Sequence, residues 1–206
     1  MYCAFCEKKG CYTGELDINN NKCPSNDKDL IDEAKKLYHE EENHKLAYNS
    51  ALVESSGYGK NTRLEEIIDF ANRCGFKRLG VAFCIGLKEE AKCLCHILKH
   101  HHFEVISVVC KNASIPKEFM GIKEDEKVRP NTREAMCNPI MQAMVLNKAQ
   151  TELNILLGLC VGHDTLFIKY SKAPITVFAV KDRVLAHNPL GAIYLANSYY
   201  KKKLYD

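Results

Sequence analysis

The sequence predicts an α/β protein with a small open parallel sheet of about four strands and helices on both faces, a Rossmann-like arrangement. Three observations lead to this class. Four short runs rich in Val, Ile, Leu and Phe alternate with helical stretches after residue 75. Apolar residues make up 46% of the chain and charged residues 27%, as in ordinary globular proteins. No apolar run reaches the roughly 18 residues needed to cross a bilayer.

The chain divides into three predicted parts. Residues 1–25 are short, polar and rich in cysteine, which predicts a metal-binding knuckle rather than a hydrophobic core. Residues 26–75 are expected to form a helical segment packed on the core, with one helix over 27–53 and a second that begins at a capping box of Thr62 and Glu65. Residues 76–206 form the α/β domain, with a cysteine cluster at the C-terminal edge of its strands.

The elements of the α/β domain follow from its hydrophobic pattern. Buried strands are predicted at residues 78–83, 104–109, 152–159 and 175–180. Helices are predicted at residues 88–100, 138–150, 164–171 and 189–203. The alternation favours parallel strands in the order 2-1-3-4. Residues 116–132 lack periodicity and are expected to form a loop that crosses the open edge of the sheet.

Net charge and cysteine content limit the classes of function. The formal net charge is +3, and no stretch gathers Lys, Arg and aromatic residues on one face, so no nucleic-acid partner is expected. The lack of a long apolar run predicts that the protein has no membrane partner either. The N-terminus lacks the layout of a secretory signal, which predicts a cytoplasmic protein. In a reducing compartment, eleven cysteines indicate metal ligation, thiolate chemistry or burial rather than a disulfide framework.

Four cysteines near the N-terminus are spaced as metal ligands. They follow the pattern Cys-x2-Cys-x4-Cys-x11-Cys-Pro and are Cys3, Cys6, Cys11 and Cys23. The two thiolates of a Cys-x2-Cys pair can bind one ion, and two more complete a tetrahedral zinc site. The same four, with proline after the last, could instead hold an iron–sulfur cluster. The spacing alone does not distinguish a zinc site from an iron–sulfur cluster. A third possibility is that the four thiols bind no metal.

Three predicted strands are each followed by a cysteine, namely Cys84, Cys110 and Cys160. The carboxyl ends of parallel strands share one edge, where neighbours lie roughly 4.8 Å apart, so these thiols can reach one cofactor. Cys137 opens a predicted helix with Asn138 as its cap, and a helix N-terminus favours the thiolate. The set predicts one shared cofactor site, with Cys137 as a fourth ligand or a reactive thiolate. The alternative is that all four are small buried hydrophobic side chains.

Charged residues follow the same predicted strand ends. His163 and Asp164 come after the third strand and are candidates for acid–base catalysis, or for capping the next helix. Lys181 and Arg183 follow the fourth strand and are candidates for binding an anionic substrate, although a surface ion-pair turn would use the same residues.

A second Asn-Pro pair repeats the pattern at Cys137. His187 and Asn188 precede Pro189 just as Cys137 and Asn138 precede Pro139, which predicts that His187 also faces the site as a catalytic residue. Both asparagines are candidates for contacting the substrate. The other cysteines lie in helical patterns and are assigned to packing; they are Cys74, Cys93 and Cys95.

These motifs resemble the family called domain of unknown function 1847, described as uncharacterised metal-binding proteins of archaea and anaerobic bacteria. The resemblance rests on the segments VAFCIGL (residues 81–87), CNPI (137–140), GLCVGHD (158–164), KDRV (181–184) and HNP (187–189). It extends over essentially the whole chain, including the N-terminal Cys-x2-Cys. The resemblance implies metal binding, without a particular reaction. An anaerobic host would favour an iron–sulfur cluster over zinc at the core cysteines, and we expect it to be of the 4Fe–4S type.

The sequence therefore favours a metal-binding protein, either a lyase or an oxidoreductase, that uses an iron–sulfur cluster in redox, desulfuration or dehydration chemistry on a small anionic substrate. Its expected partners are that substrate or a redox partner. Two alternatives stay open. One is a non-enzymatic protein with structural zinc in the knuckle and core thiols for metal storage or sensing. The other is a metal-free thiol redox protein in which Cys137 attacks and another core cysteine resolves.

Overall fold

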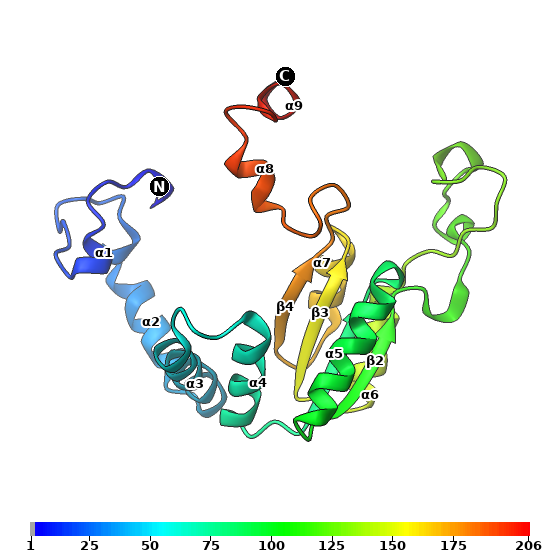
Figure 1. The fold of residues 1–206 in the computed structure, drawn as a ribbon. Helices are drawn as coiled ribbons and strands as arrows, with labels where there is room; N and C mark the ends of the chain where they lie inside the picture. The colour runs from blue at the N-terminus through cyan, green and yellow to red at the C-terminus, as the bar shows by residue number, and fades with distance from the viewer. Residues whose placement is uncertain (1–2) are drawn as a thin grey trace. The chain divides into compact units, whose positions relative to one another are not determined.

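The computed structural model describes residues 3–206, which divide into two compact units between Ser56 and Gly57 (Figure 1). The first unit holds the Cys-rich segment and the helices that follow it, and the second holds the sheet. Within the described range, no helix combines the length and the apolar character that a membrane span requires.

The first unit contains two long helices where the sequence predicted one. Its helices are α1 Gly10–Thr13, α2 Lys28–Tyr38 and α3 Glu41–Gly57. The predicted single helix over residues 27–53 is therefore wrong. The Asn43 side chain donates to the Leu37 carbonyl at 3.0 Å and so satisfies one of the open carbonyls at the end of α2. Residues 39–45 also lack any apolar side chain that would bury a continuous turn.

The second unit is built on a four-stranded parallel sheet, which confirms the predicted fold class. Its strands are β1 Arg78–Phe83, β2 Glu104–Val109, β3 Leu153–Leu159 and β4 Ile175–Val180. They pair in the predicted order β2-β1-β3-β4, and every pairing is parallel. The register aligns Phe83 with both Val109 and Leu157, so the chain leaves β1 and β2 at the same level of the sheet.

Helices cover both faces of the sheet (Figure 1). They are α4 Arg63–Arg73, α5 Lys88–His100, α6 Pro139–Lys148 and α7 His163–Tyr170. Helix α5 packs on β1 and β2, whereas α6 and α7 pack on each other across the opposite face. From β1 to β2 the chain moves one way across the sheet, and from β2 to β3 it moves the other way. Because both crossovers are right-handed, the connecting helices α5 and α6 lie on opposite faces. The predicted capping box of Thr62 and Glu65 is present at α4.

The C-terminal residues form two short helices, α8 Leu190–Tyr194 and α9 Lys201–Tyr205. The predicted single helix over residues 189–203 is therefore wrong. Between them, the Ser198 side chain and the Tyr200 N–H both donate to the Leu195 carbonyl, at 3.3 and 3.0 Å. These local bonds close turns and replace the helical hydrogen-bond ladder.

Residues 111–137 join β2 to α6 through a long loop that extends past the end of β2 (Figure 1). The loop contains three short 3-10 turns, Asn112–Ser114, Lys117–Met120 and Glu124–Glu126. An antiparallel bridge between Pro116 and Ala135 closes its base. The loop predicted over residues 116–132 is thus present, and it is a folded segment rather than a simple connection.

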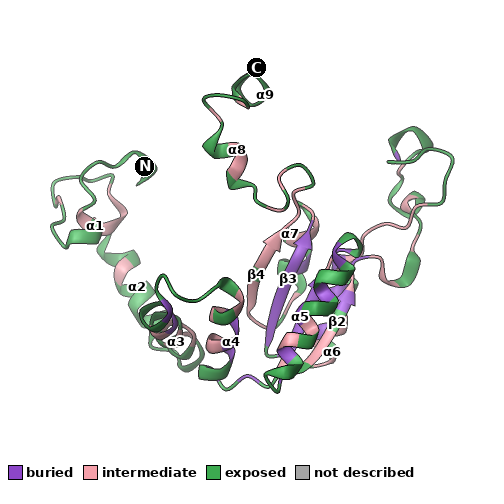
Figure 2. Ribbon diagram, viewed as in Figure 1, coloured by how far each residue is buried: buried purple, intermediate pink, exposed green. Residues whose placement is uncertain are grey.

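The hydrophobic core lies around β3, all of whose residues are buried (Figure 2). The buried cluster continues to the C-terminal ends of β1 and β2 and includes Cys84 and Cys110. Both thiols therefore take part in core packing as well as lying at the sheet edge. Cys74 is buried, as expected of a packing residue, but Cys93 is exposed on α5, so its assignment to packing is wrong.

Candidate functional site

Three thiols meet at the C-terminal edge of the sheet. Cys84 and Cys110 directly follow β1 and β2, and the parallel pairing of these strands places them side by side. Cys137 joins them because the Asn138 backbone N–H donates to the Cys110 carbonyl at 2.7 Å. The Cys110 thiol lies within hydrogen-bonding reach of both Cys84 and Cys137. We call these three residues the thiol trio.

The electrostatics of the trio favour thiolates at its two ends. The hydrogen bond from Cys110 lowers the pKa of the Cys84 thiol to about 5, with further help from the Gly86 N–H and Lys181. Hydrogen bonds with Cys110 and His163 lower the pKa of the Cys137 thiol to about 4. The contacts of Cys110 with Cys137 and with Cys84 raise the pKa of Cys110, so it keeps its proton and acts as the donor. Because a thiol has one proton, Cys110 serves one neighbour at a time, and the second thiolate depends on nearby cations.

His163 begins α7 and contacts the Cys137 end of the trio. The hydrogen bond with Cys137 raises the pKa of His163, as expected for a thiolate–imidazolium pair. Within the described part of the chain, the buried Nδ1 atom of His163 has no hydrogen-bond partner. A buried polar atom in that state is normally satisfied by water or by a ligand.

Two cations that follow β4 lie against thiols. Lys181 interacts with Cys84 through a hydrogen bond and by charge. The Nη2 atom of Arg183 donates to the Cys160 sulfur at 3.2 Å, and this contact raises the pKa of Arg183. The charge of Arg183 also acts on Cys84 and Cys137. Lys181 and Arg183, predicted to hold a substrate, therefore also offset the charge of the core thiolates.

A cavity of about 640 Å³ opens at this edge. Its walls include Cys137, Cys160, His163 and Arg183, together with residues of the 111–137 loop. The volume is in the range of small-molecule sites. The fourth core cysteine, Cys160, thus shares one cavity with the Cys137 end of the trio.

Gln142 ties the cysteine-bearing strand ends to α6. Its side chain is fully buried, and Nε2 donates to the carbonyls of Val108 at 2.7 Å and Phe83 at 3.3 Å. These two residues lie one or two positions before Cys110 and Cys84. Cys137 therefore lies just before the cap of α6, and Gln142 in the first turn of the helix supplies the amide that holds the strand ends carrying the other two thiols.

Replacement Gln142→Leu is expected to lower the free energy of unfolding by about 1–3 kcal/mol, because the Val108 carbonyl loses this buried donor. The Phe83 carbonyl still accepts from the Cys110 N–H at 2.9 Å. Urea unfolding followed by circular dichroism measures this change. The control is Lys148→Leu at an exposed position of the same helix, which should change stability by less than about 0.5 kcal/mol. Equal midpoints for the two variants would contradict the role assigned to Gln142.

The N-terminal cysteines lie in a segment without buried residues in its short helices. Cys3, Cys6 and Cys11 are exposed and Cys23 is partly buried. Polar contacts hold the segment, among them the ion pair of Lys8 with Asp17 at 2.7 Å. The structure does not bring these four cysteines together as ligands of one ion, and the metal site proposed for them from spacing stays a prediction.

The two Asn-Pro motifs adopt different conformations. Asn138 caps α6 by accepting from the Met141 N–H at 3.1 Å. By contrast, Pro189 itself is the cap of α8. His187 has a φ of +65°, and its Nδ1 accepts from the Asp182 N–H at 3.1 Å.

Neither His187 nor Asn188 belongs to the lining of the 640 Å³ cavity. Asp164 is also absent from that lining and accepts from the Thr165 N–H at 2.8 Å in the first turn of α7.

The core cysteines are not arranged as the ligands of a single ion within residues 3–206. A single ion needs three or more ligands that converge on one point, and across residues 3–206 no group of Cys, His, Asp or Glu side chains is arranged in that way. A cluster distributes its thiolate ligands over several iron atoms, so the ligands surround a group instead of a point. Four thiols at one sheet edge, with cations beside them, are the donors that such a cluster uses.

The fold and the site define a cysteine-rich α/β protein with its thiols at the carboxyl edge of a parallel sheet. The chain belongs to the family described as protein of unknown function DUF1847, whose model matches residues 23–178. It is 51% identical to a protein of Methanocaldococcus jannaschii described as uncharacterised, over 100% of this chain and 99% of the relative. No solved structure matches. The family resemblance drawn from the sequence is thus confirmed, and the matched region contains all four core cysteines but only Cys23 of the N-terminal four.

Two contributors to the site were missed from the sequence. Lys111 follows Cys110 directly, lines the cavity and donates to the Ala135 carbonyl. The strand-end argument that selected Cys110 would also have selected Lys111. Gln142 gave a weaker signal, as the polar residue within the otherwise apolar stretch 139–146 of α6.

Proposed function

We propose that Cys84, Cys110, Cys137 and Cys160 hold an iron–sulfur cluster, and that the protein acts in redox, desulfuration or dehydration chemistry on a small anionic substrate. The observation that carries this proposal is the thiol trio, in which Cys110 reaches both Cys84 and Cys137 beside a cavity that Cys160 lines. The family match over the core cysteines is consistent with it.

The residues around the thiols have complementary tasks in this proposal. Lys181 and Arg183 lower the electrostatic cost of gathering several thiolates. His163 holds a proton beside Cys137 and can exchange it with a substrate in the cavity. A bound cluster would supply electrons or a Lewis-acidic iron.

Anaerobic purification is expected to give a brown protein that contains iron and acid-labile sulfide. The double variant Cys84→Ala with Cys160→Ala should lose most of the iron, because two proposed ligands are removed. The matched control is Cys93→Ala with Cys95→Ala, two cysteines of α5 outside the site, which should keep the colour. A colourless wild-type protein, or a double variant with undiminished iron, would overturn the proposal.

One observation favours a second candidate, a metal-free dithiol protein. Cys137 pairs with His163 as an activated thiolate would, and Cys110 lies next to it. Attack of Cys137 on a substrate disulfide, followed by attack of Cys110 on Cys137, would form a Cys110–Cys137 disulfide and release two substrate thiols. A colourless protein that forms this disulfide on exposure to a small-molecule disulfide would favour this candidate over the cluster.

A further inference from the structure

The 640 Å³ cavity has two chemically different parts. One part consists of strand and helix ends and carries Cys137, His163 and Arg183. The other part is the 111–137 loop, which contributes apolar side chains. These are Met120, Ile122, Val128 and Met136. A polar reaction centre is therefore continuous with an apolar wall that the proposed chemistry does not itself require.

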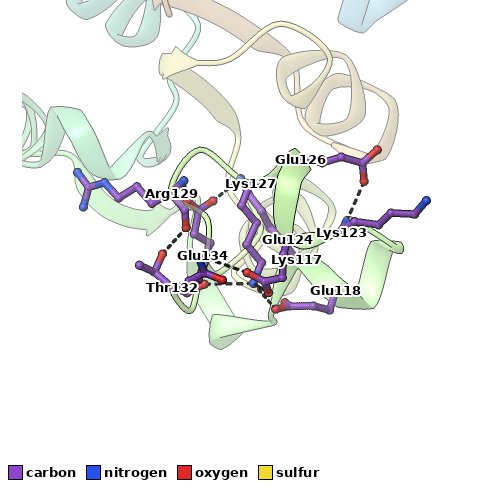
Figure 3. A network of polar contacts seen from close by, with 10 residues as sticks. Lys117, Glu118, Lys123, Glu124, Glu126, Lys127, Arg129, Thr132 and Glu134 are labelled. Atoms are coloured by element: carbon purple, nitrogen blue, oxygen red, sulfur yellow. Dashed lines mark hydrogen bonds and ion pairs between the residues drawn. The ribbon is translucent and has the colours of Figure 1, made fainter.

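The apolar wall is held in place by a buried lysine (Figure 3). The side chain of Lys127 is 2% exposed and pairs with Glu118 at 2.5 Å and with Glu124. It also donates to the Thr132 carbonyl at 3.1 Å. All three acceptors belong to the same loop, and these contacts raise the pKa of Lys127, Glu118 first. The loop thus carries its own polar core, which leaves apolar side chains free to face the cavity.

Two of the wall residues are largely uncovered. Met120 is 62% exposed and Val128 is 82% exposed, although both line the cavity. Apolar area in a cavity is stabilised when an apolar ligand covers it, by about 25 cal/mol per Å². The loop therefore offers a surface that suits an apolar portion of a bound molecule.

The charges of the lining favour an anion at the thiol end, because His163 pairs with the Cys137 thiolate and leaves Arg183 and Lys111 as further cations. Arg183 and Lys111 line this end, and each has donors beyond the single bond described above. Among the carboxylates of the lining, Glu134 is paired with Lys117, and Glu126 accepts from the Lys123 N–H. An anionic group can therefore bind beside Cys137 without facing an unpaired Glu134.

We infer that the cavity binds an amphipathic anion, with a carboxylate-like group between Arg183 and Lys111 and an aliphatic chain against Met120, Ile122 and Val128. This inference rests on the proposed function in assigning the bound molecule as its substrate. It narrows the small anionic substrate to one with an apolar chain.

Titration calorimetry of the full-length protein with straight-chain carboxylates from acetate to octanoate tests the inference. Affinity is expected to rise by about fourfold for each added methylene, the factor given by about 0.8 kcal/mol per buried methylene. The corresponding alcohols, which have the chain without the charge, should bind much more weakly. Affinity that does not change with chain length, or alcohols that bind as well as the carboxylates, would overturn the inference.

Two neighbouring side chains provide a matched pair of variants. Met120 and Phe119 share one 3-10 turn and are 62% and 71% exposed, but of the two only Met120 lines the cavity. Met120→Ser should weaken octanoate binding at least about threefold, and Phe119→Ser should leave it unchanged. Arg183→Gln should weaken the binding of every carboxylate by the same factor, whatever the length of its chain. Equal effects of the two serine variants would contradict the assigned wall.

These measurements separate the inference from the proposed function. Iron content and colour report on the cluster alone. A brown, iron-containing protein that does not distinguish acetate from octanoate would refute the amphipathic ligand and leave the cluster in place. A colourless protein that binds octanoate with the expected dependence on chain length would refute the cluster and keep the ligand class.

Discussion

Replacement of Cys110 with alanine is expected to remove almost all iron from the core site. Cys110 is the only member of the trio that reaches both of the others, and it is 2% exposed. Loss of even a supporting residue outside the ligand set commonly costs about 10–100-fold in metal affinity, so loss of this ligand should cost at least about tenfold. Iron per chain after anaerobic purification measures the effect.

Cys74→Ala is the matched control, because Cys74 is also 2% exposed but follows α4, away from the thiol trio. Thermal unfolding of both variants separates a packing defect from the loss of a ligand. Iron that is retained in Cys110→Ala, or lost equally in Cys74→Ala, would show that the trio does not organise the metal site.

Alkylation of Cys137 in the metal-free protein is expected to stay fast down to about pH 5. The thiolate is the reactive form and exists above the pKa, which Cys110 and His163 lower to about 4. An ordinary thiol, with a pKa of about 8.5, is less than about 1% ionised at pH 6. Cys137 should therefore react at pH 6 much faster than its ordinary ionisation would allow, and reactivity should fall only as the pH approaches 4.

Iodoacetamide labelling of the peptide that contains Cys137, quantified by mass spectrometry across pH, gives this profile. Removal of either hydrogen-bond partner should shift the midpoint to higher pH, with Cys110→Ala causing the larger shift and His163→Gln the smaller. A midpoint near pH 8.5 in the unmodified chain would contradict the geometry described for the trio.

The fold was largely predictable because its signals are local. The strands are continuous apolar runs, and the structure has them within one residue of the predicted bounds. The prediction that all four are buried is wrong for the edge strands, since β2 has one buried residue and β4 has none. The break between α2 and α3 coincides with residues 39–45, which lack any apolar side chain, and the expected helix was drawn through this gap. The bond from the Asn43 side chain to the Leu37 carbonyl is the part that periodicity could not show. Such a capping contact leaves no trace in the spacing of apolar residues.

The site was predictable where it follows from sheet topology. Cysteines that directly follow adjacent parallel strands have to be neighbours, and Cys84 and Cys110 are. The repeated Asn-Pro motif was a poorer guide. His187 has a left-handed backbone conformation, and its Nδ1 accepts from the Asp182 N–H. The Asn-Pro pair that follows His187 therefore does not position it as the equivalent pair positions Cys137. The apolar wall was invisible in the sequence, since irregular loops have no periodicity to read.

The bridge between Pro116 and Ala135 separates the outer part of the 111–137 loop from the sheet edge that carries the thiols. The thiols are attached to strands and to α6, whose geometry is set by the core. The residues beyond the bridge are held by Lys127 and its carboxylates, independently of that core. Insertions or substitutions beyond the bridge can therefore alter which molecules are accepted while the reactive groups stay in place. Selectivity and chemistry can then evolve on different parts of one chain.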